Sequence, residues 1–515
     1  MKLLRLHTIR LLLMALIVLP ATTSCFNYDD EDIIIDSQSG SHYINVTISV
    51  SASDSPVTRA NPVGGEYGDG VEKGIDPREN EVNDITLIFF KDNAGINTTN
   101  TNTEVLFVKK YAVHEATSAD YPSNYTHTHK ETEPTSGYYS KEVIYTTGNQ
   151  RLEETDLEVG QTYQILVVAN ADPLVVPGDK IVNVREKVNA LAYSGTGAGI
   201  NATNFVMTSE TDASVTLSNP TLIEDENKYI YYFDCIHIER LAARIDYCTR
   251  GATYNETYGG YVYTKGNDIY VVTKVTPFNL FNESEYFFKR VQDAWPAIST
   301  TYLGDESLTN YVVDPLTAGK NDAAAAQALS YSNRLTDLLP VPGNDDTNPY
   351  TQVMADVHTS SSIIDDNNDN CIIIGYPREN TLKPDSPLKL FATGIVFEID
   401  FYRNVNGPGG GGPGGGPGGG GPGGNPRPET RKYYHYLRHQ GEPLVNTHSY
   451  KAERLERPKV EQDNSTCGDV PMKCGIVRNN IYRVSITGFS DEDGTITLTI
   501  EEEKWRHVDN PTIYI

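Results

Sequence analysis

The residue types that carry catalysis or bind metals occur in this sequence without the spacing that such chemistry needs. His127 and His129 would place two imidazoles on one face of a strand, but no carboxylate or cysteine partner is evident nearby. The run 366–370 begins like a calcium loop, yet Cys371 and Pro377 stand where that loop needs glycine and glutamate. No nucleophile elbow, phosphate-binding glycine loop or distinctive carboxylate pair is present. We therefore expect no enzyme activity, no metal site and no cofactor.

One cysteine near the amino terminus is preceded by residues typical of a site where lipid is attached. A basic stretch, residues 2–10, precedes the apolar run 11–19, which is too short to span a bilayer as a permanent helix. Small residues then lead into Cys25, and this order resembles a lipobox, where the signal peptide is removed and the cysteine is acylated, for example with palmitate. Thr22 stands where leucine is usual, so a plain signal peptide with a chance cysteine is the alternative.

The remaining cysteines leave their pairing open. Five of the six cysteines remain once the lipidated one is set aside, so at least one is unpaired or pairs between chains. Cys467 and Cys474 flank a short loop and could form a disulfide. Cys235 and Cys248 bracket the run 236–247, whose ends lie too far apart to bridge if it is one strand rising ~3.3 Å per residue.

Composition and charge limit the partners. The 515 residues carry a net charge of −27, which argues against nucleic acid and against an anionic membrane surface. A chain of this length is expected to form two to four domains. Tyrosine, at 33 residues against 14 phenylalanines, suits half-exposed strand surfaces where the ring packs and the hydroxyl stays in water.

Alternation of apolar and polar residues is the dominant local pattern, and it predicts half-buried strands. In the first such run, 44–50, one face carries Ile44, Val46, Ile48 and Val50. Further strands are predicted at 85–90, 162–169, 205–208, 214–217, 236–247, 269–275, 388–401, 481–489 and 495–501. Helices are predicted at 178–193, with Asp179 as N-cap, and at 322–339. Mostly strands joined by polar loops indicate an all-β chain of sandwiches.

Residues 407–424 are almost pure glycine and proline. They lack the three-residue period of collagen and lie between two strand-like runs. We interpret this tract as a long, flexible hairpin loop rather than a domain linker.

Several patches follow one another along the chain in an order that resembles a known family. The patches are Pro56-Val57-Thr58-Arg59-Ala60 and the runs 82–90, 160–171, 205–210, 238–245, 476–482 and 498–515. Behind a lipobox and a first strand, this order resembles the Bacteroidia-type fimbrilins, the subunits of type V pili. The insertions at 283–365 and at the glycine and proline tract depart from the shortest members, which leaves open a shaft, tip or accessory subunit.

The resemblance implies a fold and a processing route. The fold would be two transthyretin-like β-sandwich domains with a few short helices. Its parts would be a signal peptide (1–24), a propeptide with the first strand (25–59), an amino-terminal domain (60–240) and a carboxy-terminal domain (241–515). An Arg-specific protease would cut between Arg59 and Ala60. The lipid on Cys25 would carry the precursor through the periplasm to the outer membrane and the cell surface.

The same reasoning predicts assembly by strand exchange. Cutting out the first strand, with Ile44, Val46, Ile48 and Val50, would leave an apolar groove with unpaired backbone edges. The carboxy-terminal tail is the expected donor, through Leu498, Ile500, Val508, Ile513 and Ile515. Burying four aliphatic side chains gives about 6–12 kcal/mol before ordering costs. The partners would be other copies of the chain and related fimbrial subunits, in a fimbria that supports adhesion.

Two other classes compete with a polymerising subunit. A surface lipoprotein that binds glycans and stays monomeric would favour exposed tryptophan platforms, and the chain has two tryptophans. A tip or anchor accessory subunit that retains its lipid should lack the cleavage site at Arg59.

Overall fold

The structure of the chain is a computed structural model. It describes residues 40–49, 79, 81–91, 103–116, 144–152, 155, 157–185, 187–189, 204–209, 213–223, 226–281, 285–288, 291–292, 310–311, 331–332, 334–339, 355–356, 362–364, 370–381, 391–403, 428–438, 447–456, 475–490 and 494–504.

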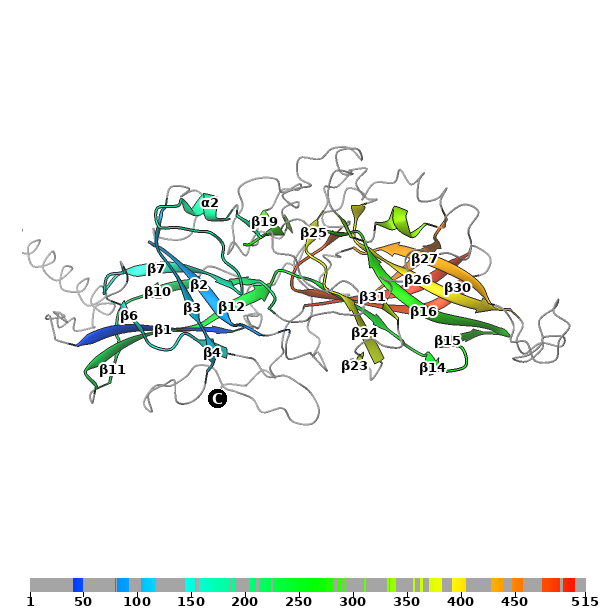
Figure 1. The fold of residues 1–515 in the computed structure, drawn as a ribbon, viewed down its shortest axis with the longest axis horizontal. Coiled ribbons are helices and arrows are strands. Elements are labelled where there is room, and N and C mark those ends of the chain that lie inside the picture. The colour runs from blue at the N-terminus through cyan, green and yellow to red at the C-terminus, as the bar shows by residue number, and fades with distance from the viewer. Residues whose placement is uncertain are drawn as a thin grey trace, which may run out of the picture.

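Strands make up almost all of the regular structure in these residues (Figure 1). Two large sheets, of 11 and 12 strands, take the amino-terminal and carboxy-terminal halves of the chain. The molecule is elongated, with the first sheet towards one end and the second towards the other (Figure 1). The predicted all-β class is confirmed.

The first sheet follows the path β3-β2-β7-β9-β12-β1-β5-β4, with β10 on β7, β11 on β12 and β6 on β1. Its strands are β1 (Ser41–Ser49), β2 (Asp84–Lys91), β3 (Val105–Ala112), β4 (His114–Glu115), β5 (Ile144–Thr146), β6 (Gln150–Arg151), β7 (Thr162–Ala169), β9 (Met207–Ser209), β10 (Ala213–Thr216), β11 (Thr221–Ile223) and β12 (Lys228–Arg240). The long strand β12 pairs with β1 along its first part and with β9 at its end, so it belongs to two layers.

A shared core lies between these two layers. Apolar side chains of β1, β2, β7 and β12 form one buried cluster. The rings of Phe89 on β2 and Phe233 on β12 face each other across it, 6.4 Å apart. The outer face of β2 and β7 is covered as well, by α2 (Ile181–Arg185) and by Phe287 and Phe288. The amino-terminal half is therefore a sandwich with an additional apolar cover on one side.

The second sheet follows the path β14-β15-β16-β26-β27-β28-β31-β30-β13-β24-β23, with β22 on β16. Its strands are β13 (Arg244–Cys248), β14 (Thr253–Asn255), β15 (Gly260–Lys265), β16 (Asp268–Phe278), β22 (Ala355–Asp356), β23 (Ser362–Ile364), β24 (Asn370–Gly375), β26 (Gly394–Tyr402), β27 (Glu429–Tyr436), β28 (Thr447–Arg454), β30 (Asn480–Ser490) and β31 (Thr495–Lys504).

Strands from the two halves of this path pack against each other. Tyr270 on β16 stacks on Phe489 of β30 with ring centroids 3.9 Å apart. Tyr247 on β13 meets Phe397 of β26 edge to face at 5.8 Å. Strands distant along the path thus share one core, which makes the second half a sandwich too.

Short pairings and one 3-10 helix complete the described structure. The pairs are β8 (Val188–Asn189) with β18 (Glu285–Tyr286), β17 (Leu280–Phe281) with β21 (Tyr331–Ser332), β19 (Val291–Gln292) with β20 (Asn310–Tyr311), and β25 (Asn380–Thr381) with β29 (Gly475–Ile476). The 3-10 helix is η5 (Leu335–Leu338). The β8–β18 pair brings part of the insertion 283–365 onto the amino-terminal half.

Some predicted elements differ from the structure. The run 236–247 is not one strand, because β12 ends at Arg240 and β13 begins at Arg244. Between them, Ala242 O accepts from Asn479 N–H at 2.8 Å and Ala243 N–H donates to Pro377 O at 2.9 Å, so the backbone leaves the ladder.

The predicted helices are shorter in the structure or replaced by other elements. The helix expected at 178–193 is reduced to α2, and Asp179 accepts from the preceding Val176 N–H instead of capping the helix. Within 322–339 the described residues form β21 and η5.

Asn170 ties three of the sequence patches together in the first sandwich. Its φ of 57° ends β7 in the left-handed region that asparagine tolerates. Its side-chain amide donates to Glu81 O and to Phe205 O, both at 2.8 Å. Its Oδ1 accepts from Asn83 N–H at 2.9 Å. The runs 82–90, 160–171 and 205–210 therefore meet at one point and serve the fold.

Candidate strand-exchange site and the domain junction

The first strand, β1, occupies an interior position in its sheet. On one side it pairs in parallel with β12, where Ile44 lies opposite Tyr231 and Ile48 opposite Ile236. On the other side it pairs antiparallel with β5 and β6. All of these partners come much later in the chain than β1, and β2, the next strand in the sequence, does not pair with it. The strand is thus inserted between elements that the rest of the chain provides.

Alternate side chains of β1 point into the core, as the sequence predicts. Ile44, Val46 and Ile48 are each 0% exposed and belong to the large amino-terminal cluster. The fourth residue of that face, Val50, lies outside the described residues. At roughly 1.5–3 kcal/mol for each buried aliphatic side chain, these three contribute about 4.5–9 kcal/mol to holding the strand.

Polar side chains of β1 and its neighbours fix the register. Thr47 Oγ1 donates to Phe233 O of β12 at 3.0 Å. Thr146 Oγ1 of β5 donates to Asn45 Oδ1 at 2.6 Å, and Asn45 Nδ2 donates to Asn149 Oδ1 at 3.1 Å. A one-residue slip would move the apolar face out of the core and break these bonds.

Two tyrosines that flank the strand stay uncharged. Burial raises the pKa of Tyr231 on β12 to about 12, with a smaller contribution from Tyr229. Burial also raises the pKa of Tyr145 on β5. These neighbours of β1 therefore present neutral rings and hydroxyls, which suits an apolar strand.

The predicted donor residues divide into two groups. Leu498 and Ile500 lie on β31, which pairs with β28 on one side and β30 on the other. Both side chains are buried in the core of their own carboxy-terminal sandwich. Val508, Ile513 and Ile515 lie outside the described residues. Leu498 and Ile500 are therefore core residues of their own sandwich.

Several other predicted sites lie outside the described residues. They are Cys25, Arg59, Ala60, Cys467, Cys474, His127, His129 and the tract 407–424. Within the described part of the chain, no helix is long and apolar enough to cross a membrane. The same residues contain no group of three or more His, Cys, Asp or Glu side chains placed to hold a metal ion.

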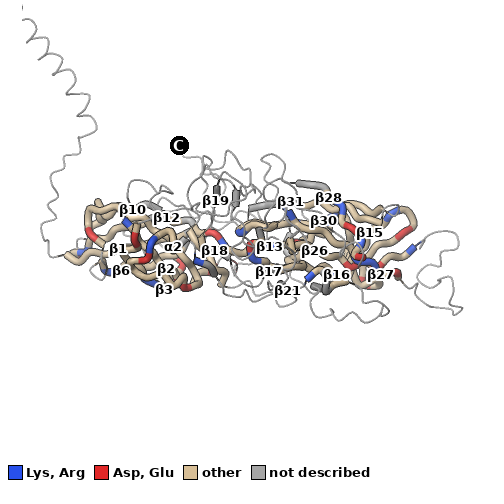
Figure 2. The backbone as a smooth tube through the Cα atoms, turned by 90° about the horizontal axis from the view of Figure 1, so that it is seen from above, with Lys and Arg blue, Asp and Glu red and all other residues tan. Residues whose placement is uncertain are grey.

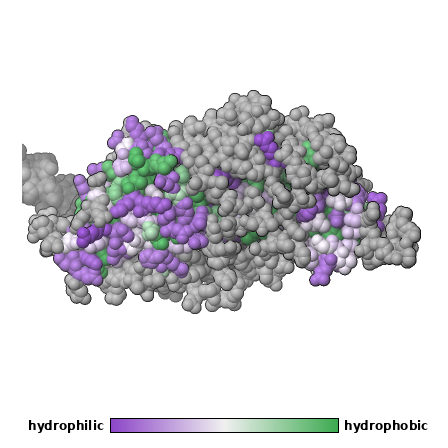
Figure 3. All heavy atoms as spheres, viewed as in Figure 1, coloured by the Kyte–Doolittle hydropathy of each residue, from purple (hydrophilic) through white to green (hydrophobic). Residues whose placement is uncertain are grey.

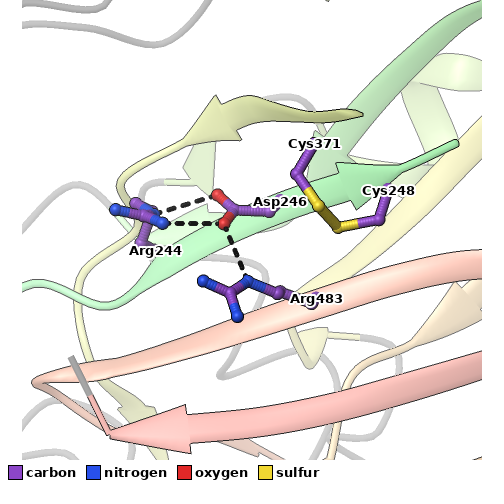
Figure 4. The surroundings of a disulfide bond; sticks show 5 residues. All are labelled: Arg244, Asp246, Cys248, Cys371 and Arg483. Atoms are coloured by element: carbon purple, nitrogen blue, oxygen red, sulfur yellow. Dashed lines mark hydrogen bonds and ion pairs between the residues drawn. A yellow bond between two sulfur atoms is a disulfide. The ribbon is translucent and has the colours of Figure 1, made fainter. Parts of the chain in front are cut away.

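A disulfide that the sequence did not predict joins β13 to β24. Cys248 and Cys371 face each other in adjacent antiparallel strands and are bonded through their sulfurs (Figure 4). The two residues are 123 positions apart in the sequence, so only the strand pairing brings them together. The bond closes a long loop that contains β14 to β23, which restricts the unfolded chain.

Beside this disulfide lies a buried cluster of charged residues. Arg244 is 0% exposed and makes two hydrogen bonds to Asp246, at 3.0 and 2.8 Å (Figure 4). Its Nη1 also contacts both carboxylate oxygens of Glu79, at 3.3 and 3.0 Å. The hydroxyl of Tyr376 donates to Glu79 as well, and burial, followed by the charge of Glu79, raises the pKa of Tyr376. Removing one partner from such a buried pair costs about 3–5 kcal/mol.

A second buried arginine connects the two halves of the chain. Arg478 donates to Glu379 Oε2 at 3.1 and 2.8 Å, and its Nη1 donates to Phe287 O at 2.8 Å. The same carbonyl oxygen accepts from Thr208 Oγ1 of β9 at 2.9 Å. Phe287 therefore receives hydrogen bonds from both sandwiches.

Two sequence patches meet at this junction. Asn479 N–H donates to Ala242 O at 2.8 Å, and Asn479 Oδ1 accepts from Arg240 Nη1 at 3.2 Å. Figure 2 shows positively and negatively charged residues near β13, in the middle of the elongated molecule. The runs 238–245 and 476–482 thus build the connection between the sandwiches. In the sequence, the feature that could have indicated this buried junction is the presence of Arg240, Arg244 and Arg478 inside or beside apolar runs.

On the face drawn in Figure 3, the surface of the described residues is mostly hydrophilic, with smaller apolar areas. Among the described residues the exposed large hydrophobic side chains are Leu174, Val176 and Leu222. Figure 3 shows an apolar area near α2, the helix that follows Leu174 and Val176 in the chain.

Comparisons with known proteins give structural neighbours only. No family model matches the chain, and no curated protein sequence matches it significantly. The fold is similar to a fimbrilin of Porphyromonas gingivalis, with 12% identity, a TM-score of 0.38 and coverage of 92% of this chain and 99% of that one. It is also similar to the C-terminally truncated tip fimbrial protein of the same organism, with 9% identity, a TM-score of 0.36 and coverage of 90% and 100%. A fimbrial assembly protein of Parabacteroides distasonis is similar at 10% identity, a TM-score of 0.31 and coverage of 89% and 98%.

Proposed function

We propose that the chain is a structural subunit of a surface fimbria that polymerises by donor-strand exchange and supports adhesion. The observation that carries the proposal is the placement of β1. This strand is buried between β12 on one side and β5 and β6 on the other, although it precedes all of them by a long stretch of sequence. A strand near the start of the chain that no sequence neighbour holds can be released by one cut.

Release of β1 would create a receptor for another strand. The facing edges of β12 and of β5 and β6 would lose their hydrogen-bond partners, and the core face now covered by Ile44, Val46 and Ile48 would open to water. Unpaired edges beside an apolar groove bind an added strand through main-chain hydrogen bonds and alternate side chains. When each subunit fills the groove of the next, the contact does not close, so a filament grows.

The cut is proposed to fall between Arg59 and Ala60, in the segment between β1 and β2. Cys25 precedes this bond, so the lipid that anchors the precursor to the outer membrane would leave together with β1. Processing would then couple loss of the anchor to opening of the groove.

The donor is proposed to be the chain after Lys504. Donating β31 would extract Leu498 and Ile500 from their own core and break the ladders with both β28 and β30. A tail beyond β31 avoids that loss. Burying Val508, Ile513 and Ile515 in the neighbour's groove would contribute about 4.5–9 kcal/mol, similar to what β1 contributed.

Assembly of the purified protein tests the proposal. A precursor that begins after Cys25 is cut with an Arg-specific protease and followed by light scattering, electron microscopy and amino-terminal sequencing. We expect filaments whose subunits begin at Ala60, and no filaments from Arg59→Lys, the matched control. Filaments from uncut protein, or cut subunits that stay monomeric, would contradict the proposal. The second outcome is the one expected of a glycan-binding lipoprotein.

A further inference from the structure

The segment between β1 and β2 contains two arginines, Arg59 and Arg78, so an Arg-specific protease meets two candidate bonds. Cleavage at either bond would separate β1 from the rest of the chain. The preference of the protease for arginine therefore does not by itself decide at which of the two bonds the mature subunit begins. This inference rests on the processing step of the proposed function and concerns how that step is confined to one bond.

The residue after the second arginine is locked into the junction between the sandwiches. Glu79 is 0% exposed. Its carboxylate accepts from Arg244 Nη1 at 3.3 and 3.0 Å and from the Tyr376 hydroxyl. Its backbone carbonyl accepts from Arg240 Nε at 3.0 Å. Both the side chain and the main chain of this residue are thus held, by partners from β12, β13 and the chain after β24.

A protease binds its substrate as an extended strand on both sides of the bond that it cuts. For the bond between Arg78 and Glu79, the residue on the carboxyl side must leave the buried cluster before it can enter the protease cleft. That movement would break the hydrogen bonds that Arg244 and Tyr376 make to the Glu79 carboxylate in the folded protein. Cleavage of such a bond follows the population of the locally opened state, which this cluster keeps small.

We propose that Glu79 protects the Arg78–Glu79 bond and thereby confines processing to the Arg59–Ala60 bond. The mature subunit then keeps residues 60–78, attached to the junction through Glu79. β1 leaves without loosening the contacts that join the two sandwiches.

The experiment compares cleavage rates at the two bonds in the same molecule. Folded precursor and urea-unfolded precursor are treated with an Arg-specific protease, and the products are quantified by mass spectrometry. In the unfolded chain the two rates should differ only by the local sequence preference of the protease. In the folded chain we expect the ratio of cleavage after Arg59 to cleavage after Arg78 to rise on the order of 100-fold, because cutting after Arg78 needs local opening.

Variants assign the protection to Glu79. Glu79→Gln keeps the size of the side chain and removes its charge, and it should increase cleavage after Arg78 at least about tenfold. Tyr376→Phe removes a single hydroxyl and should increase it less. The matched control is Glu81→Gln, two residues along, which should change neither rate. Cleavage after the buried Arg240 or Arg244 reports global unfolding, so Tyr376→Phe decides the result if Glu79→Gln unfolds.

Equal ratios in folded and unfolded wild-type protein would overturn the inference. So would unchanged cleavage after Arg78 in both Glu79→Gln and Tyr376→Phe. These outcomes are distinct from failure of the proposed function, in which cut subunits remain monomeric whichever bond is cleaved.

Discussion

The binding of β1 in its groove can be weakened by a substitution that leaves every other step of the proposed assembly reaction unchanged. Ile48 is fully buried and lies between Ile236 on β12 and Tyr145 on β5. Ile48→Ala removes its buried aliphatic atoms and leaves a cavity, which costs about 2–5 kcal/mol in a packed core. In the uncut precursor, this loss should appear in full in the free energy of unfolding.

After the cut, β1 is held by the same contacts but no longer by the chain. At about 1.4 kcal/mol for each factor of ten, the loss corresponds to ~30-fold to ~4,000-fold weaker binding of the released strand. The variant should therefore assemble faster than wild type once it is cut. In the proposed mechanism the finished filament contains no β1, so the resistance of variant filaments to denaturant should equal that of wild-type filaments.

Three measurements check these expectations. Denaturant unfolding reports the stability of the precursor, light scattering after addition of protease reports the rate of assembly, and denaturant dissociation reports the stability of the filaments. Leu222→Ala is the control, because this side chain is 40% exposed on β11, the strand on the other edge of β12. We expect it to change stability by no more than about 0.5 kcal/mol. If cut Ile48→Ala protein assembles no faster than wild type, or if its filaments are weaker, displacement of β1 is not the assembly step.

Three further predictions follow from the same mechanism. Cys25→Ala should remove lipid labelling and leave the protein in the periplasm, and cell fractionation showing normal surface display would contradict the lipoprotein route. Tyr43→Cys combined with Arg151→Cys places thiols on register partners of β1 and β6, so oxidation should block assembly of cut protein and a reductant should restore it. Deleting residues 506–515 should leave a folded, processed monomer that cannot extend a filament, whereas Leu498→Ala should lower the stability of the monomer itself by about 2–5 kcal/mol.

The strands that could be predicted from the sequence are those marked locally by a continuous apolar run or by alternating apolar and polar residues. The run 162–169 matches the bounds of β7, and the alternation at 44–50 marks β1. The run 236–247 has isoleucines near both ends, but Leu241, Ala242 and Ala243 in its middle are neither β-branched nor aromatic, and this weak signal was not enough to separate β12 from β13. The break at Leu241 to Ala243 is imposed by hydrogen bonds from chain segments far away in the sequence.

The pairing of distant residues could not be predicted for the same reason. Cys371 is adjacent to Cys248 only because β24 lies beside β13, and many connectivities were open to the cysteines. Glu79 follows a stretch without a periodic pattern, and nothing local indicates that its carboxylate reaches Arg244, 165 residues later. Charged residues inside apolar runs, such as Arg244, were the available hint that a buried ionic cluster exists.

β1 and β31 are both interior strands with buried aliphatic side chains, and burial alone therefore does not identify which of them exchanges. The difference lies in how each strand is connected. A single cut before β2 turns β1 into a separate peptide, so its contacts are all that retains it. β31 stays covalently joined to β30, and both of its edges are paired within its own sandwich. Moving β31 to a neighbour would return its core contacts to water before any new contact forms, whereas a donor taken from the chain after Lys504 would leave β31 in place. In the proposed mechanism β1 is therefore the strand to be replaced, and the residues after Lys504 are the donor that costs its own sandwich least.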